Sequence, residues 1–346
     1  MAQAGPTVLW NDSADPAELS ESISYGAVGA TCNPVIALAA IRADLPGWQA
    51  WIREIAAENP EFSESEIGWR VVEEVSINAA KLLEPAFEKY AGINGRLSMQ
   101  TDPRNARSAK KLVEQAVHFS TLAPNIIVKV PATKTGVEAI EEATYQGVSI
   151  NVTVSFSAAQ ALATGEAIER GLKRREAEGK DISTMGPVVT IMVGRVDDWM
   201  KDVYARDGLT FPKEYLEWAG VAVFKHAYAE FKRRGLRARL LSAAFRNTLQ
   251  WSEFVGGDVV ISPPFKWQQQ IQASDATAEP RMDIPVDQEI LDALLTMPEF
   301  HKAYDYDGMT PEQFEEFGAT RKTLRQFLGA DEELDHIVRD ILYPAP

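Results

Sequence analysis

The sequence predicts an α/β protein, a (β/α)8 TIM barrel with a C-terminal helical extension. Eight short runs rich in Val, Ile and Leu alternate with longer amphipathic segments. Several runs are continuously apolar, which is typical of strands buried on both faces of a parallel sheet. A doubly wound sheet would show the same alternation. The barrel is favoured because eight units extend over roughly 260 residues, close to its usual size of about 250.

The strand candidates are spread along the first three quarters of the chain, at 7–10, 27–31, 95–99, 126–130, 148–154, 188–193, 239–243 and 259–262. Helical patterns occupy 63–89, 104–120, 135–146, 157–178 and 212–234. The first of these helices is predicted to begin at Ser63, because Glu66 completes a capping box three residues later.

The last part of the chain is polar and helical, with clear patterns at 288–296 and 310–327. Residues 178–186 and 273–283 are expected to form surface loops. We therefore predict a barrel over residues 1–270, followed by a helical extension over 271–346 that packs on the barrel.

Composition excludes several classes of protein. The 346 residues carry 35 Lys and Arg against 50 Asp and Glu, a net charge of −15, which argues against nucleic-acid and anionic-membrane partners. A single cysteine excludes a disulfide framework, and four dispersed histidines make a metal site improbable, so no metal or cofactor is expected. The N-terminal residues lack signal-peptide features and no apolar run reaches 18 residues, so a cytoplasmic protein is expected. A homo-oligomer is compatible with the sequence.

Lys129 is the most distinctive residue, because it lies inside the apolar strand candidate Ile-Ile-Val-Lys-Val-Pro. Burial disfavours the ammonium form and makes the amine a nucleophile toward carbonyl groups, as Schiff-base catalysis requires. A structural lysine paired with a carboxylate such as Asp12 explains the pattern equally well from spacing alone. Asp12 itself has the alternative of a turn or N-cap residue.

Other polar residues also fall near the carboxyl ends of the strands, where barrel enzymes place their active sites. Arg195 and Arg246 follow consecutive strands and would form an oxyanion clamp together, although each alone would be a surface ion-pair residue. Asn33, before Pro34, has the alternative of a residue that fixes the loop.

Ordered segments of the chain resemble the transaldolase family of class I aldolase-type barrels, over residues 7–267. They are Trp-Asn-Asp-Ser (10–13), Gly-Ala-Thr-Cys-Asn-Pro (29–34), Gly-Arg-Leu-Ser (95–98), Ile-Val-Lys-Val-Pro-Ala-Thr (127–133), Asn-Val-Thr (151–153), Phe-Ser-Ala-Ala-Gln-Ala (156–161), Val-Gly-Arg (193–195) and Ala-Phe-Arg-Asn (244–247). Each segment is weak alone, and the ordered set is specific.

The resemblance implies a role for each matching residue. Lys129 would form the Schiff base, and Asp12 would exchange protons with sugar hydroxyls. Thr153 would position a catalytic water. The implied substrate-binding residues are Asn33, Ser98, Asn151, Thr190, Arg195 and Arg246.

Four positions depart from the family pattern. Gln100 stands where transaldolases carry a catalytic glutamate, and an amide is no general base near neutral pH. The related fructose-6-phosphate aldolases share this glutamine but pair it with a tyrosine, where this chain has Met192. Ala244 replaces a common serine, and Cys32 a common threonine.

The expected function is transfer or release of a dihydroxyacetone unit from a ketose phosphate, or a similar anionic ketose such as a sulfonate, through a lysine Schiff base. One alternative is a lyase of the fructose-6-phosphate aldolase type. Another is a catalytically weakened paralogue that binds sugar phosphates. A nucleotide-binding protein is not supported, because no Gly-rich phosphate-binding motif follows the first strand.

Overall fold

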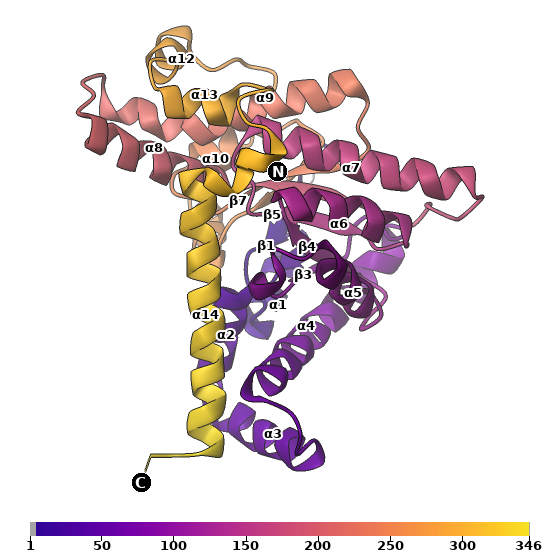
Figure 1. Cartoon of the computed structure of the whole chain (residues 1–346). Coiled ribbons are helices and arrows are strands. Elements are labelled where there is room, and N and C mark those ends of the chain that lie inside the picture. The colour runs from indigo at the N-terminus through magenta and orange to yellow at the C-terminus, as the bar shows by residue number, and fades with distance from the viewer. Residues whose placement is uncertain (1–4, 346) are drawn as a thin grey trace.

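A closed barrel of eight parallel strands forms the centre of the protein (Figure 1). The structure is a computed structural model that describes residues 5–345. Each strand pairs with the next in sequence order, and β8 pairs with β1 to close the ring. The predicted fold class is thereby confirmed. Among residues 5–345, no helix combines the length and the apolar character that a membrane crossing requires.

The eight strands are short and almost entirely buried. They are β1 (Val8–Asn11), β2 (Ala27–Thr31), β3 (Arg96–Gln100), β4 (Ile126–Pro131), β5 (Ile150–Thr153), β6 (Val188–Ile191), β7 (Arg239–Ala243) and β8 (Val259–Ser262). Their bounds agree with the predicted runs within two residues. The one shift that affects the site is at β6, which ends at Ile191 because a helix begins at Val193.

Helices fill the connections between the strands. They are α1 (Pro16–Ser24), α2 (Pro34–Ala43), α3 (Leu45–Glu58), α4 (Glu64–Lys89), η1 (Pro103–Asn105), α5 (Ala109–Ser120), α6 (Lys134–Tyr145), α7 (Ala158–Ala177), α8 (Val193–Asp207), η2 (Lys213–Trp218), α9 (Ala219–Arg234) and α10 (Leu249–Ser252). The predicted capping box of Ser63 and Glu66 opens α4. The first three helices, α8 and α10 were not predicted.

The chain after β8 is helical as predicted. It forms α11 (Phe265–Gln272), α12 (Gln288–Leu294), α13 (Pro298–Tyr304), η3 (Pro311–Glu316) and α14 (Gly318–Leu342). The pattern over 310–327 thus covers η3 and only the first part of a much longer helix. The predicted division at residue 270 falls within α11, and it stays a prediction.

A cluster of apolar side chains fills part of the barrel interior. Trp10, Ile127, Val188, Leu241 and Val260 form a fully buried cluster within the ring of strands. Trp10 lies against the backbone of β2 at Gly29, where an added Cβ atom would come within 2.4 Å of the indole. A packed apolar layer therefore supports the polar residues that lie further along the strands.

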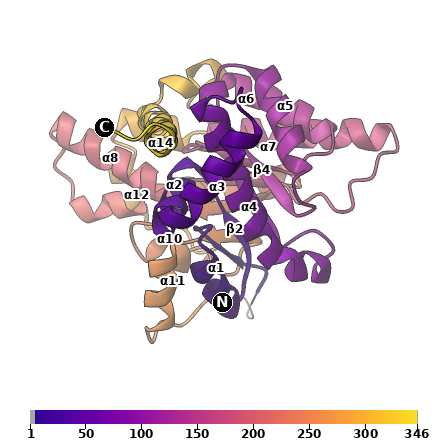
Figure 2. The same cartoon turned by 90° about the horizontal axis from the view of Figure 1, so that it is seen from below.

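Helix α14 crosses the end of the barrel at which the strands terminate. Near its start, Thr323 accepts a hydrogen bond from Arg195, which lies in the first turn of α8, just after β6. Two turns later, Asp331 lies 2.7 Å from the guanidinium of Arg104, which lies in η1 in the segment after β3. These strands are three places apart in a ring of eight. The helix then continues alongside α2 towards α3 (Figures 1 and 2).

Candidate active site

Three polar side chains lie level with one another on neighbouring strands. Lys129 on β4 is in register with Gln100 on β3 and with Asn151 on β5. All three are buried, and Lys129, the most exposed of them, has a relative exposure of 6%. Since side chains alternate across a strand, the same faces of these strands also carry Ser98 and Thr153. The predicted lysine is therefore at the centre of a buried polar layer.

Burial lowers the pKa of Lys129, because the surroundings disfavour the ammonium ion. The negative charges of Asp12 and of an ionised Cys32 oppose this change. The Cys32 thiol is itself buried, and burial raises its pKa to about 11, so a thiolate nucleophile is disfavoured at this position. The chemistry available here is that of an amine whose neutral form is favoured by burial, close to a carboxylate.

Asp12 follows β1 and faces the same space. Its carboxylate accepts a hydrogen bond of 2.5 Å from the hydroxyl of Thr31 on β2, and its backbone amide donates to Pro263 after β8. The N-cap of α1 is Asp15 instead, so the alternative of a capping role for Asp12 does not hold. The carboxylate is therefore held in place by a neighbouring strand.

A line of hydrogen bonds crosses the buried layer from β6 to β3. The Thr190 hydroxyl donates to Oδ1 of Asn151 at 2.8 Å, and Nδ2 of Asn151 donates to the hydroxyl of Ser98 at 2.9 Å. All three residues are at most 2% exposed. The line fixes the rotamer of Asn151 and leaves the Ser98 hydroxyl proton to donate further into the layer.

The other predicted residues lie at the ends of their strands. Thr153 ends β5 and is paired with Pro131 at the end of β4. Asn33 caps α2, because its Oδ1 accepts hydrogen bonds from the backbone amides of Val35 and Ile36. This contact agrees with the alternative that Asn33 fixes the loop. The Nδ2 group takes no part in the cap. Gln100 has a buried Oε1 with no hydrogen-bond partner.

Arg195 and Arg246 lie together in a pocket of about 380 Å³ at the rim of the barrel. Burial lowers the pKa of Arg195, and the nearby charge of Arg246 lowers it further, while Asp198 and Asp12 oppose the change. Arg246 is paired with Asp198 at 2.8 Å. Two converging guanidiniums with one exchangeable carboxylate suit an oxyanion ligand.

Sequence reasoning missed the residues that surround this arginine pair. Asp198 lies one turn after Arg195 on α8, and Thr323 comes from α14, 128 residues away in the chain. Gln250 accepts a hydrogen bond from the backbone amide of Arg246 and donates to the buried carboxylate of Asp197. The helical periodicity of 193–200 could have indicated Asp198, whereas nothing local indicates Thr323.

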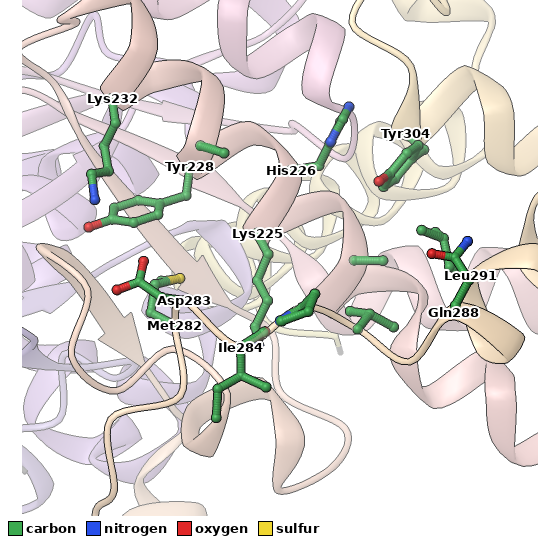
Figure 3. A pocket seen from close by; sticks show the side chains of 14 residues that line it. Lys225, His226, Tyr228, Lys232, Met282, Asp283, Ile284, Gln288, Leu291 and Tyr304 are labelled. Atoms are coloured by element: carbon green, nitrogen blue, oxygen red, sulfur yellow. Dashed lines mark hydrogen bonds between the residues drawn. The ribbon is translucent and has the colours of Figure 1, made fainter.

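A separate pocket of about 490 Å³ lies on the outer face of α9 (Figure 3). Lys225, His226 and Tyr228 of α9 line it, together with Tyr304 of α13. The Lys225 ammonium is engaged by Glu253 at 2.7 Å and by two backbone carbonyls. None of the predicted site residues lines this pocket, so the chemistry expected from the sequence is concentrated at the barrel end.

Comparison with known proteins gives a family match and several relatives. Residues 9–328 match the family model described as Transaldolase/Fructose-6-phosphate aldolase. A transaldolase of Parafrankia sp. (strain EAN1pec) is 32% identical over 220 residues, 63% of this chain and 58% of that protein. A transaldolase of Thermobifida fusca (strain YX) is 35% identical over 173 residues, 49% of this chain and 46% of that protein.

The aligned parts thus span about half the length of these relatives. The family match, by contrast, extends from β1 into α14 and includes every strand of the barrel. It covers all ten residues that were expected from the sequence to form the site. The chain belongs to the Transaldolase/Fructose-6-phosphate aldolase family.

Proposed function

We propose that this chain is a transaldolase-like enzyme that transfers or releases a dihydroxyacetone unit from a ketose phosphate, or a similar anionic ketose, through a Schiff base on Lys129. The observation that carries the proposal is the position of Lys129, a buried lysine of lowered pKa. Asp12 is close enough to influence that pKa. Family membership supports the same chemistry.

The first half of the reaction breaks a carbon–carbon bond. The neutral Lys129 amine adds to the C2 ketone, and loss of water leaves an iminium ion. Asp12 takes the proton of the C4 hydroxyl while the C3–C4 bond breaks. The bonding electrons move into the iminium and give an enamine, and the aldehyde half leaves. The iminium accepts the electron pair, so the step needs no further cofactor.

In the second half, the enamine either attacks an acceptor aldose phosphate or takes up a proton. In the first case Asp12 returns its proton to the new alkoxide, and hydrolysis of the iminium releases a ketose three carbons longer than the acceptor. In the second case hydrolysis releases free dihydroxyacetone. The Ser98–Asn151–Thr190 line is suited to hold the hydroxyl groups of the dihydroxyacetone unit, and the arginine pair to hold the terminal oxyanion.

A lyase is the second candidate, and Gln100 is the observation that favours it. Gln100 is level with Lys129 and carries a buried, unpartnered amide oxygen. An amide can orient a water molecule but cannot relay a proton as a carboxylate does. At this position, therefore, an amide and not a carboxylate influences whether the dihydroxyacetone unit is transferred or released.

Borohydride trapping tests the proposal directly. Incubation with fructose 6-phosphate and borohydride should reduce the iminium and leave a stable adduct on the peptide that contains Lys129, located by mass spectrometry. Lys129→Met should abolish the adduct. Lys134→Met is the matched control, because this half-exposed lysine lies five residues away on α6 and pairs with Glu312. An adduct that persists in Lys129→Met would refute the proposal.

Product analysis separates the candidates. With a ketose phosphate alone, a lyase releases dihydroxyacetone continuously, whereas a transferase stops after one turnover until an acceptor aldose phosphate is added. Binding of fructose 6-phosphate and sedoheptulose 7-phosphate without turnover of either would identify the weakened paralogue instead.

A further inference from the structure

The pocket of the arginine pair has a third wall that comes from the C-terminal helix. Arg195 and Asp198 reach it from α8, and Arg246 reaches it from the segment after β7. On the opposite side, the pocket is lined by Ala319, Lys322, Thr323 and Gln326, which repeat at helical spacing on one face of α14.

Tight packing fixes this part of α14 against α8. An added Cβ at Gly318 would come within 2.0 Å of the Trp199 ring, so the two helices approach as closely as a glycine allows. Phe317 meets the same indole edge-on, with ring centroids 6.3 Å apart. Phe327, one turn past Thr323, lies under the guanidinium of Arg195 at 5.7 Å. The wall is therefore built rigidly.

Thr323 is positioned to contact a ligand of Arg195. It is 1% exposed, and its hydroxyl oxygen accepts from Nη1 of Arg195 at 3.1 Å. Because that oxygen acts as the acceptor, the hydroxyl proton is available for a second acceptor in the pocket. The Nε atom of Arg195 is buried with no hydrogen-bond partner, which leaves a further donor at the same place.

The charges around the pocket match a dianion. Its charged lining side chains are three cations, Arg195, Arg246 and Lys322, and one carboxylate, Asp198, which gives a net charge of +2. Lys322 pairs with Asp202 at 2.6 Å, but both side chains are at least half exposed. An exposed pair of this kind is weak and exchanges readily for a better anion.

We infer that α14 completes the oxyanion site and that Lys322 and Thr323 are specificity-determining residues that select a dianionic phosphate terminus over a monoanionic sulfonate or an uncharged one. The inference rests on the proposed function of the same site. The Lys322 ammonium adds attraction that grows with the charge of the ligand. The Thr323 hydroxyl donates to a phosphate oxygen and holds Arg195 in place.

The test uses the full chain and compares fructose 6-phosphate with fructose. Lys322→Gln and Thr323→Val should each lower the ratio of kcat/KM for the two ketoses by about fivefold, mainly through KM, in line with the worth of one exposed charge pair or one hydrogen bond. Thr323→Ser keeps the hydroxyl and should restore most of the ratio. Lys302→Gln, at an exposed lysine of α13 outside the pocket, should change nothing.

A competition experiment measures charge selection without turnover. Inorganic phosphate at pH 8 should compete with fructose 6-phosphate more strongly than methanesulfonate does, and Lys322→Gln should narrow the difference. Two results would overturn the inference, provided that the adduct on Lys129 still forms. One is equal competition by the two anions. The other is an unchanged ratio of kcat/KM for the two ketoses in both Lys322→Gln and Thr323→Val. Failure of the wild type to form that adduct with any ketose would instead remove the proposed function.

Discussion

Lys129 is surrounded by groups that influence its charge in opposite directions. Burial lowers its pKa, and the carboxylate of Asp12 raises it. Only the neutral amine attacks a ketone, so the balance between these effects sets the pH range in which an adduct can form. The immediate surroundings of Lys129 therefore decide the pH dependence of adduct formation.

Adduct formation should increase with pH and reach its plateau below the ordinary lysine pKa of 10.5. Asp12→Asn removes the charge that favours the ammonium form, so the midpoint of this pH profile should move lower. The measurement is the rate of cyanoborohydride trapping with dihydroxyacetone between pH 6 and 10. A midpoint that moves higher in Asp12→Asn would contradict this reading of the two charges.

Gln100→Glu should raise the rate of dihydroxyacetone transfer by at least about tenfold, because a carboxylate can act in general acid–base catalysis where an amide cannot. The substitution keeps the size of the side chain and adds an ionisable group level with Lys129. Transfer to an acceptor aldose phosphate is measured against release of dihydroxyacetone. Gln100→Met is the matched control of similar size. A flat response would place the proton relay at another group.

The packing of β2 against Trp10 depends on the glycine at position 29. Trp10 occupies the space next to Gly29, so Gly29→Ala forces the indole or the strand to move. The free energy of unfolding should fall by about 1–3 kcal/mol, as expected for overpacking of a filled core. Gly329→Ala is the contrasting control, because this glycine lies in α14 with open space around it and alanine favours the helix. Thermal unfolding of both variants checks the prediction.

The contact of α14 with the end of β3 is sensitive to pH. Burial, together with the charge of Asp102, raises the pKa of Asp331 to about 7, while Arg104 opposes this and Asp335 and Glu332 add to it. The folded state thus holds the proton more tightly than the unfolded chain, whose carboxyl has its ordinary pKa of 3.8. Stability contributed by this group is present at low pH and is lost as the pH rises from about 4 to 7.

Asp331→Asn should therefore gain stability relative to the wild type between pH 5 and pH 8, on the order of 1–2 kcal/mol. The measurement is the difference in Tm between variant and wild type at several pH values. Asp340→Asn, on an exposed part of the same helix, should show no such trend. A difference that is constant with pH, or that reverses, would contradict the linkage.

The whole molecule is expected to unfold as one unit. Phe317, at the N-cap of α14, and Phe327 and Leu334 within it belong to the same buried cluster as the residues between the barrel strands and their helices. Because these residues of the extension share the core of the barrel, far-UV circular dichroism and tryptophan fluorescence should report coincident unfolding curves. Hydrogen exchange in α14 should be as slow as in the barrel strands. An early, separate transition of α14 would show instead that residues 271–346 form an independent unit.

The sequence was sufficient to predict the barrel, because buried parallel strands produce continuous apolar runs that are hard to mistake. It also located Lys129 and the arginine pair, since each follows or lies within such a run. It could not place Thr323 or Lys322 in the pocket of the arginine pair, because their helical pattern shows which face is apolar and not which strand end that helix will cover. Contacts across 128 residues depend on tertiary packing alone.

The position of α14 also has a consequence for the order in which the protein is made. The residues proposed for bond cleavage and the arginine pair are all synthesised by residue 246, and the barrel strands are complete at residue 262. The wall that includes Thr323 emerges about 60 residues later, several seconds afterwards at usual rates of translation. The lysine proposed as the nucleophile is therefore present in the nascent chain before the arginine pocket is complete, and the proposed ligand selection becomes effective only after α14 has emerged.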